Sequence, residues 1–158
     1  MKAIRFVFLS ILLTLTISTG ATADGKKDPL KKAIEARIGL MKNYSWNAGP
    51  LFQMAKGKME YDAEKAAAYA KNLELISMMN NGSHWPAGSD NEAYPDDTRT
   101  LKALWETFPK VGERGQAFKT ASAELAAVAG DGLDALRSKI GALGKSCKGC
   151  HDDYRAEK

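Results

Sequence analysis

The chain has 158 residues, of which 27% are charged, and its formal net charge at pH 7 is +4. This length fits one domain with an adequate core, and so small a charge provides no polybasic surface for nucleic acid. The chain contains only 2 cysteines, which excludes a framework of several disulfides.

The first 23 residues have the pattern of a secretory signal peptide. Lys2 and Arg5 form a basic start, an apolar stretch occupies positions 6–17, and Ala21-Thr22-Ala23 is a small-residue cleavage site. The apolar stretch is shorter than the about 20 residues that a bilayer-spanning helix needs. We therefore expect a periplasmic mature domain, residues 24–158, without a membrane span. Loss of Lys2 and Arg5 lowers its formal charge to +2.

Two long helices are predicted in the first half of the mature chain. Asp28 as N-cap and Pro29 at the first helical position begin a helix that we expect to reach Gly57, either straight or kinked at Pro50. Asp62 caps a second helix, which ends before Asn80-Asn81-Gly82. The apolar positions expected to face inward are Leu30, Ile34, Ile38 and Met41 in the first helix and Ala66, Tyr69, Leu73 and Ile76 in the second.

The second half begins with a segment rich in Pro, Gly, Asp and Asn, residues 83–97, which predicts a long surface loop. Residues 101–108 form a short helical turn, Pro109 interrupts it, and a third long helix follows to about Gly130. A fourth helix opens after Asp131-Gly132. Inward positions are Val111, Phe118, Ala121, Leu125 and Val128 in the third helix and Leu133, Leu136, Ile140, Leu143, Cys147, Cys150 and Tyr154 in the fourth.

Both cysteines lie in one run, Cys147-Lys148-Gly149-Cys150-His151, the attachment signature of a c-type haem. Residues three and four apart share one helix face, so both thiols can reach one haem edge while His151 points toward the iron. The thiols continue the apolar stripe of the fourth helix. We therefore expect an all-α, antiparallel four-helix bundle with one covalently bound haem, and its iron, in the core.

Two other sites use cysteines at this spacing. A thioredoxin-like pair follows a strand and opens a helix, and no strand-like run precedes Cys147. A structural zinc site needs four ligands, and the only imidazole besides His151 is the distant His84 in the predicted loop. We expect His84 to be solvent-exposed rather than a ligand.

With these parts together, the chain resembles the class II cytochromes c, the cytochrome c′ family. The resemblance covers the whole mature sequence and is carried by the C-terminal haem motif, by Arg37-Ile38-Gly39-Leu40-Met41 in the first helix, and by Lys56-Gly57 and Tyr61-Asp62. It implies thioether bonds at Cys147 and Cys150 and His151 as the proximal iron ligand. It also implies that Arg37 contacts a haem propionate and that Arg155 lies beside the proximal histidine. For both arginines the alternative is a solvated helix face.

The family's distal position falls on Met41. As a sixth iron ligand its sulfur gives a shielded, low-spin electron carrier of raised potential. As an ordinary apolar side chain it leaves a five-coordinate iron that binds nitric oxide or carbon monoxide. The sequence leaves both alternatives open.

We expect a protein that passes single electrons between periplasmic redox partners, with the binding or detoxification of NO or CO as the alternative. No catalytic constellation is evident, so we expect no enzymatic activity; the acidic pair Asp152-Asp153 is interpreted as a solvated face. A thiol–disulfide oxidoreductase is the third hypothesis. Trp46, Trp85 and Trp105 are either pocket or packing residues. Members of the resembled family often form homodimers through the first two helices, and Leu40 and Leu51, outside the main stripe, permit one here.

Overall fold

The computed structural model describes residues 28–157, so the predicted signal peptide and the mature start near Asp24 lie outside the described part. Within it the chain is helical, as predicted, and the only backbone pairing of the β type is one isolated bridge between Thr100 and Arg155. The elements in chain order are α1 (Pro29–Ala55), α2 (Ala63–Ser77), the 3₁₀ turn η1 (Gly82–His84), α3 (Ala103–Glu106), α4 (Phe108–Ala126) and α5 (Leu133–Tyr154).

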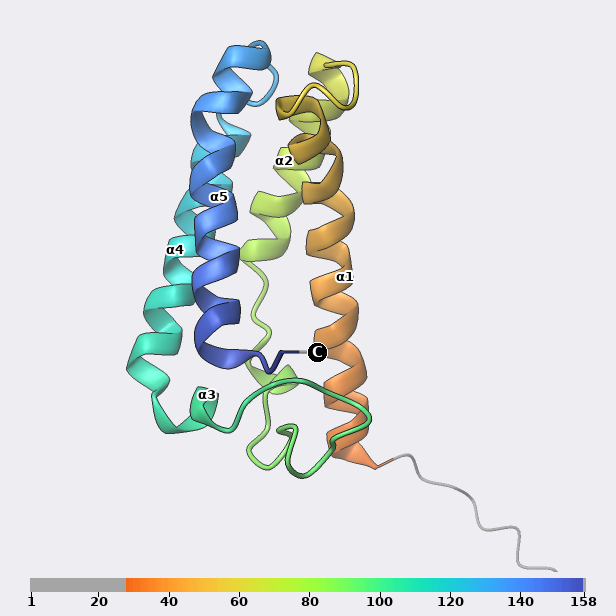
Figure 1. The fold of residues 1–158 in the computed structure, drawn as a ribbon, viewed down its shortest axis with the longest axis vertical. Coiled ribbons are helices and arrows are strands. Elements are labelled where there is room, and N and C mark those ends of the chain that lie inside the picture. The colour runs from red at the N-terminus through yellow and green to blue at the C-terminus, as the bar shows by residue number, and fades with distance from the viewer. Residues whose placement is uncertain (1–27, 158) are drawn as a thin grey trace, which may run out of the picture.

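The four long helices form an antiparallel bundle in which α1 and α4 run one way and α2 and α5 the other (Figure 1). Each packs against two neighbours, in the ring order α1, α2, α4, α5. The predicted four-helix bundle is therefore confirmed. Within residues 28–157, no helix combines the length and the apolar character needed to cross a bilayer.

The predicted starts of α1, α2 and α5 are accurate, whereas the start of α4 and several helix ends are not. Asp28 accepts a hydrogen bond from the backbone N–H of Leu30 (2.9 Å), and α1 continues through Pro50 to Ala55. It stops two residues before Gly57, whose φ of +70° takes the chain out of the helix. The third long helix differs more from its predicted bounds, because α4 already begins at Phe108. Pro109 occupies its first turn, where proline is tolerated, and so does not interrupt the helix.

The inward face of α1 differs from the predicted stripe. Of the four positions expected inside, only Ile34 is fully buried, and Met41 is 38% exposed. The buried residues of α1 are Ile34, Arg37, Leu40, Asn47, Ala48, Leu51 and Met54. Leu40 and Leu51 therefore belong to the interior of the chain, and the suggestion that they face a second copy was wrong.

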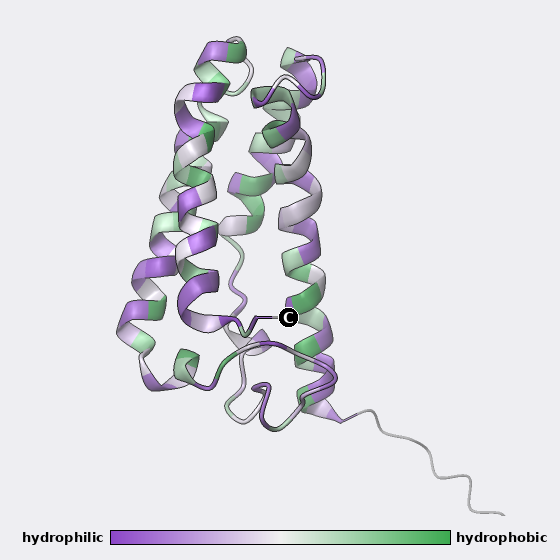
Figure 2. Cartoon of the chain, viewed as in Figure 1, coloured by the Kyte–Doolittle hydropathy of each residue, from purple (hydrophilic) through white to green (hydrophobic). Residues whose placement is uncertain are grey.

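The apolar core occupies one end of the bundle. Its buried members lie between Ala48 and Met54 on α1, on α2, on α4 from Ala121 and in the turn just after it, and between Leu136 and Leu143 on α5. Hydrophobic residues alternate with hydrophilic ones along each helix, as amphipathic bundle helices require (Figure 2). On α5 this core cluster ends one turn before Cys147.

The other end of the bundle is built differently because α2 is short. With 15 residues against 27 in α1, it is about 22 Å long against about 40 Å. Below its end, the segment from Met78 to Lys102 crosses the foot of α1 and α5 (Figure 1). Ser89, Asp90 and Thr98 are less than 10% exposed, so the prediction of a simple surface loop was wrong. This segment covers the end of the bundle at which the Cys-x-x-Cys-His run lies.

Candidate haem-binding site

The three residues of the predicted attachment motif lie on one face of α5. Cys147, Cys150 and His151 fall within its last turns, and both cysteines are free thiols, partly buried between α5 and its neighbours. Lys148, between them, is exposed. A helix that carries residues at i, i+3 and i+4 in this way presents two sulfurs and one imidazole to the same side.

The protonation of these groups suits haem attachment better than thiol redox chemistry. Burial raises the pKa of the Cys147 and Cys150 thiols, whereas a thiol–disulfide centre needs a depressed pKa. Burial also lowers the pKa of His151, and the positive charges of Arg155 and Arg99 lower it further. His151 is therefore neutral at pH 7, with a lone pair free to bind a metal.

The two alternative cysteine sites find no support in this geometry. Within residues 28–157, no three His, Cys, Asp or Glu side chains converge as metal ligands, so the zinc hypothesis lacks its donor set. The cysteines lie near the end of a 22-residue helix rather than at the start of one that follows a strand. The arrangement of a thioredoxin-like centre is therefore missing from the described part of the chain.

An aromatic pair that joins α1 and α4 lies near the first cysteine. The rings of Tyr44 and Phe118 meet edge to face, with 4.6 Å between centroids and 60° between planes. Burial raises the pKa of Tyr44, and the nearby Cys147 thiol adds to the shift. Cys147 thus lies where α1, α4 and α5 meet, in surroundings apolar enough for a porphyrin edge.

Arg37 is the buried cation of the site, with only 2% of its surface exposed. It donates hydrogen bonds to Ser89 Oγ (2.6 Å), to the Ser89 carbonyl and to Thr98 Oγ1 (3.0 Å). Its guanidinium carbon lies 5.3 Å from the ring centroid of Trp85 and 5.9 Å from that of Trp105. The alternative of a solvated arginine is therefore excluded.

One donor of Arg37 has no hydrogen-bond partner among the described residues. Its Nε is buried without a hydrogen-bond partner, and Arg37 is in no ion pair among those that the described residues form. The Asp90 carboxylate acts on Arg37 through its charge but forms no hydrogen bond with this N–H. A buried N–H on a cation is costly to leave unpaired, so this atom favours an anionic acceptor. A haem propionate has that chemistry, and the observation therefore fits the predicted contact.

The remaining predicted residues are placed more loosely. Met41 lies one turn before Tyr44 on α1 and is not a core filler, since 38% of its surface is exposed. Arg155 is exposed and follows α5 directly, close enough for its charge to act on His151.

His84 is partly buried rather than exposed, and its Nδ1 has no partner among the described residues. Trp46 is 75% exposed and lines no pocket around the motif.

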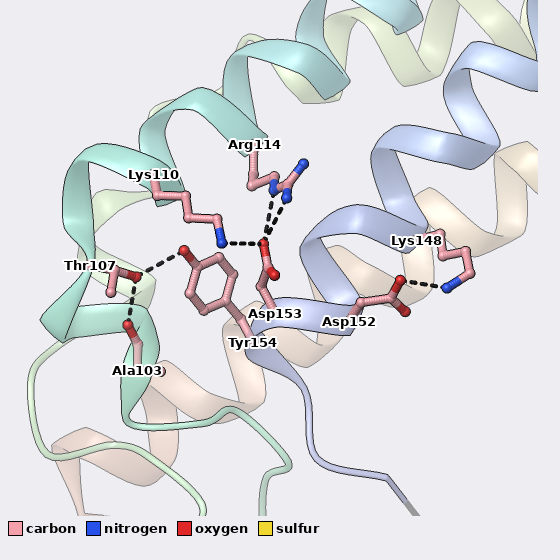
Figure 3. A network of polar contacts seen from close by, with 8 residues as sticks. All are labelled: Ala103, Thr107, Lys110, Arg114, Lys148, Asp152, Asp153 and Tyr154. Atoms are coloured by element: carbon pink, nitrogen blue, oxygen red, sulfur yellow. Dashed lines mark hydrogen bonds and ion pairs between the residues drawn. The ribbon is translucent and has the colours of Figure 1, made fainter.

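The chain after the motif is tied to the loop. The Leu101 N–H donates to the Tyr154 carbonyl and the Ala156 N–H to the Arg99 carbonyl, both at 2.9 Å. Tyr154 is buried, and its hydroxyl is 2.8 Å from Thr107 Oγ1 (Figure 3). These contacts bring Arg99 near His151, a neighbour that no local sequence pattern indicated.

The acidic pair after His151 does not form one solvated face. Asp152 pairs with Lys148 on the outer side of α5, as expected of a surface residue. Asp153 instead accepts from Arg114 and pairs with Lys110, both on α4 (Figure 3). Arg114 was also missed from the sequence, although it occupies the third helix's own stripe, three residues after Val111 and four before Phe118.

Comparison with known proteins supports the same interpretation. The model of the cytochrome c′ family matches residues 32–155. The chain belongs to the cytochrome c′ family. A cytochrome c′ of Halomonas halodenitrificans is 37% identical over 131 residues, which cover 79% of this chain and 96% of the relative. A cytochrome c′ of Cereibacter sphaeroides is 31% identical, and the alignment covers 98% of this chain and 99% of the relative.

A solved cytochrome c′ structure, from Rhodobacter sphaeroides, superposes with a TM-score of 0.80 at 32% identity. The superposition covers 84% of this chain and 100% of the solved chain. The cofactor of this family is a covalent haem c, and the two cysteines of this chain suit it. The geometry of α5 described above predicts that Cys147, Cys150 and His151 hold the haem.

Proposed function

We propose that this protein carries single electrons between periplasmic redox partners, with its haem attached through thioethers to Cys147 and Cys150. The observation that carries the proposal is the grouping of two partly buried, protonated thiols and one neutral imidazole on a single face of α5. His151 supplies the proximal iron ligand, and the haem supplies the one-electron Fe(III)/Fe(II) couple. The chain itself orients these groups and excludes water with Tyr44 and Phe118.

The arginines have separate tasks in this proposal. Arg37 donates its free Nε to a haem propionate, while its other nitrogens hold the loop at Ser89 and Thr98. Burial is the main cause of the lowered pKa of His151, and the positive charges of Arg155 and Arg99 add to it, so the imidazole is neutral and ready to bind iron. No residue in this arrangement acts as a nucleophile or general base, and we propose that the protein is not an enzyme.

The test is the absorption spectrum of the purified protein. Covalent haem that survives acid–acetone extraction supports attachment through Cys147 and Cys150, and the Cys147→Ser/Cys150→Ser double variant should lose it. A folded wild-type protein without covalently bound haem would end the proposal. The mass of the mature protein, recovered from a periplasmic fraction, tests export and cleavage before Asp24.

The alternative function is the binding of a diatomic gas. Two structural neighbours from Alcaligenes xylosoxidans, 26% identical to this chain, were solved with such ligands: an arginine-to-lysine variant with NO and a leucine-to-glycine variant with carbon monoxide. Electron transfer is favoured here because the Met41 side chain is not packed in the apolar core. Its flexible thioether can therefore reach a metal.

Carbon monoxide added to the ferrous protein separates the two functions. If Met41 binds the iron, CO should bind slowly or incompletely, and Met41→Ala should convert the spectrum to the five-coordinate type. Met41→Leu is the matched variant that keeps the volume and loses only the sulfur. Fast, complete CO binding by the wild type, unchanged in both variants, would favour the gas-binding function.

A homodimer through α1 and α2 is the last part of the proposal. Trp46 on α1 and Leu75 on α2 are 75% and 53% exposed, more than expected for large apolar residues of a bundle. A cytochrome c′ neighbour, 27% identical, shows ligand-controlled dimer dissociation. Sedimentation of the wild type and of Trp46→Gln decides the point, since the variant should be monomeric at concentrations where the wild type is dimeric.

A further inference from the structure

Two cations of α4, Arg114 and Lys110, reach Asp153 on the predicted attachment turn of α5 (Figure 3). The Nε of Arg114 donates to Asp153 Oδ2 at 3.0 Å, and its Nη2 lies 2.9 Å from the same oxygen. Lys110, one turn earlier, places its Nζ 3.3 Å from that oxygen. The Asp153 side chain is only 25% exposed, so this contact is shielded from solvent more than an ordinary surface pair.

The same guanidinium lies across the middle of the haem motif. A Cβ built on Gly149 would come 3.1 Å from Arg114 Nη1 and 3.5 Å from Cζ. Gly149 precedes Cys150, and the charge of Arg114 acts on that thiol. The Lys148–Asp152 pair on the same turn differs, because both partners belong to α5 and are 75% and 56% exposed.

We propose that Arg114 and Asp153 form a clamp that holds the haem-attachment turn against α4 through Gly149, and that their opposite charges act in opposite directions on the reduction potential. This inference rests on the proposed attachment of haem at Cys150. A positive charge near the iron favours the reduced state and raises the potential, and a negative charge lowers it. Arg114 and Asp153 are positioning residues, since neither binds the iron.

The first test compares the potentials of neutralised variants of the intact holoprotein. Arg114→Gln should lower the potential, because it removes one positive charge and leaves Asp153 with Lys110 as its remaining partner. Asp153→Asn should raise it, since Arg114 and Lys110 both remain. The matched controls are Lys148→Gln and Asp152→Asn, whose exposed charges are screened by salt and should shift the potential less. Shifts of the same sign in the two clamp variants, or shifts no larger than those of the controls, overturn the proposal.

The second test examines the steric part of the clamp. Gly149→Ala should lower the unfolding midpoint of the holoprotein, because the guanidinium must shift away from the new methyl group and its contact with Asp153 loosens. In an Arg114→Ala background the same change should cost nothing, and a glycine-to-alanine change in an open helix is even stabilising. Additive effects of the two substitutions would contradict the clamp.

The two proposals fail in distinguishable ways. A wild-type protein that folds without covalent haem overturns the proposed function, whereas the coupling between positions 114 and 149 is still measured by unfolding. A haem-containing wild type with no such coupling overturns the clamp alone.

Discussion

Tyr61 and Gly132 are joined by a hydrogen bond between the two turns at the end of the bundle remote from the motif. The Gly132 N–H donates to the Tyr61 hydroxyl at 2.9 Å, and that hydroxyl donates to the Ala129 carbonyl at 2.9 Å. Gly132 has a φ of +120°, a conformation that glycine adopts readily. One side chain thus fastens the α1–α2 connection to the α4–α5 connection.

Replacing Tyr61 by Phe should therefore lower the free energy of unfolding by about 1–3 kcal/mol, since two backbone groups lose their partner. Denaturant unfolding of the holoprotein measures the change. The haem spectrum should stay that of the wild type, because the turn lies far from Cys147 along α5. A spectrum altered by Tyr61→Phe would contradict this division between the two ends of the bundle.

Gly141 and Gly144 provide a matched pair on α5. A Cβ at Gly141 meets nothing within 4 Å, whereas one at Gly144 lies 3.3 Å from Phe52 Cζ on α1. Gly141→Ala should stabilise the protein by about 0.5–1 kcal/mol, the ordinary helix preference of alanine. Gly144→Ala should stabilise the protein less than Gly141→Ala, or destabilise it, because the Phe52 ring must move. Equal stabilisation by both, measured by thermal unfolding, would show that α1 does not approach α5 so closely.

The loop contacts of Arg37 predict an effect that does not depend on the haem. Arg37→Met keeps most of the side-chain volume but leaves Ser89 without its donor and removes one of the hydrogen bonds to Thr98, which should cost about 1–3 kcal/mol. Amide hydrogen exchange in residues 83–101 should accelerate with it. Lys32→Met, an exposed change on the same helix, is the control. Unchanged exchange in the loop would mean that Arg37 serves the cofactor alone.

Asp28 predicts a pH dependence of stability at the start of α1. The hydrogen bond from the Tyr94 hydroxyl (2.6 Å) lowers the pKa of the Asp28 carboxyl, and the Leu30 N–H lowers it further. A folded-state pKa below the unfolded value of about 3.9 stabilises the protein above that pH. This stabilisation is lost as the pH falls through the lower folded-state pKa.

Asp28→Asn should accordingly be less stable than the wild type at neutral pH, and the difference should shrink below about pH 4. Urea unfolding of both proteins at several pH values measures it. Tyr94→Phe should reproduce part of the effect, because it removes the largest cause of the shift. A stability difference that is constant with pH would exclude the carboxylate as its source.

Local signals predicted much of this molecule. The start of α1 follows from an N-cap aspartate and a proline, which act within one turn and need no tertiary partner. The common face of Cys147, Cys150 and His151 follows from helical spacing alone. The burial of Arg37 and the engagement of Asp153 were missed because their partners are 52 and 39 residues away in the chain.

The apolar faces of the helices also contained a signal that two arginines are buried or paired. Arg114 interrupts the apolar face of α4 at a position where the spacing expects a hydrophobic residue, and Arg37 does the same on α1, three residues after Ile34. A charge at such a position needs a partner, but the partner's identity depends on which helix or loop packs opposite. That information exists only once the bundle is assembled.

The amino-acid sequence alone thus determined the helical class, the starts of α1, α2 and α5 and the chemistry of the C-terminal motif, because capping, periodicity and i, i+3, i+4 spacing are local properties of the chain. The tertiary structure decided which charges are buried and what they contact. The short α2 brings the 78–102 segment under the bundle, and the packing of α4 on α5 places Arg114 across Gly149. Such neighbours depend on how the helices and loop pack, which no local pattern encodes.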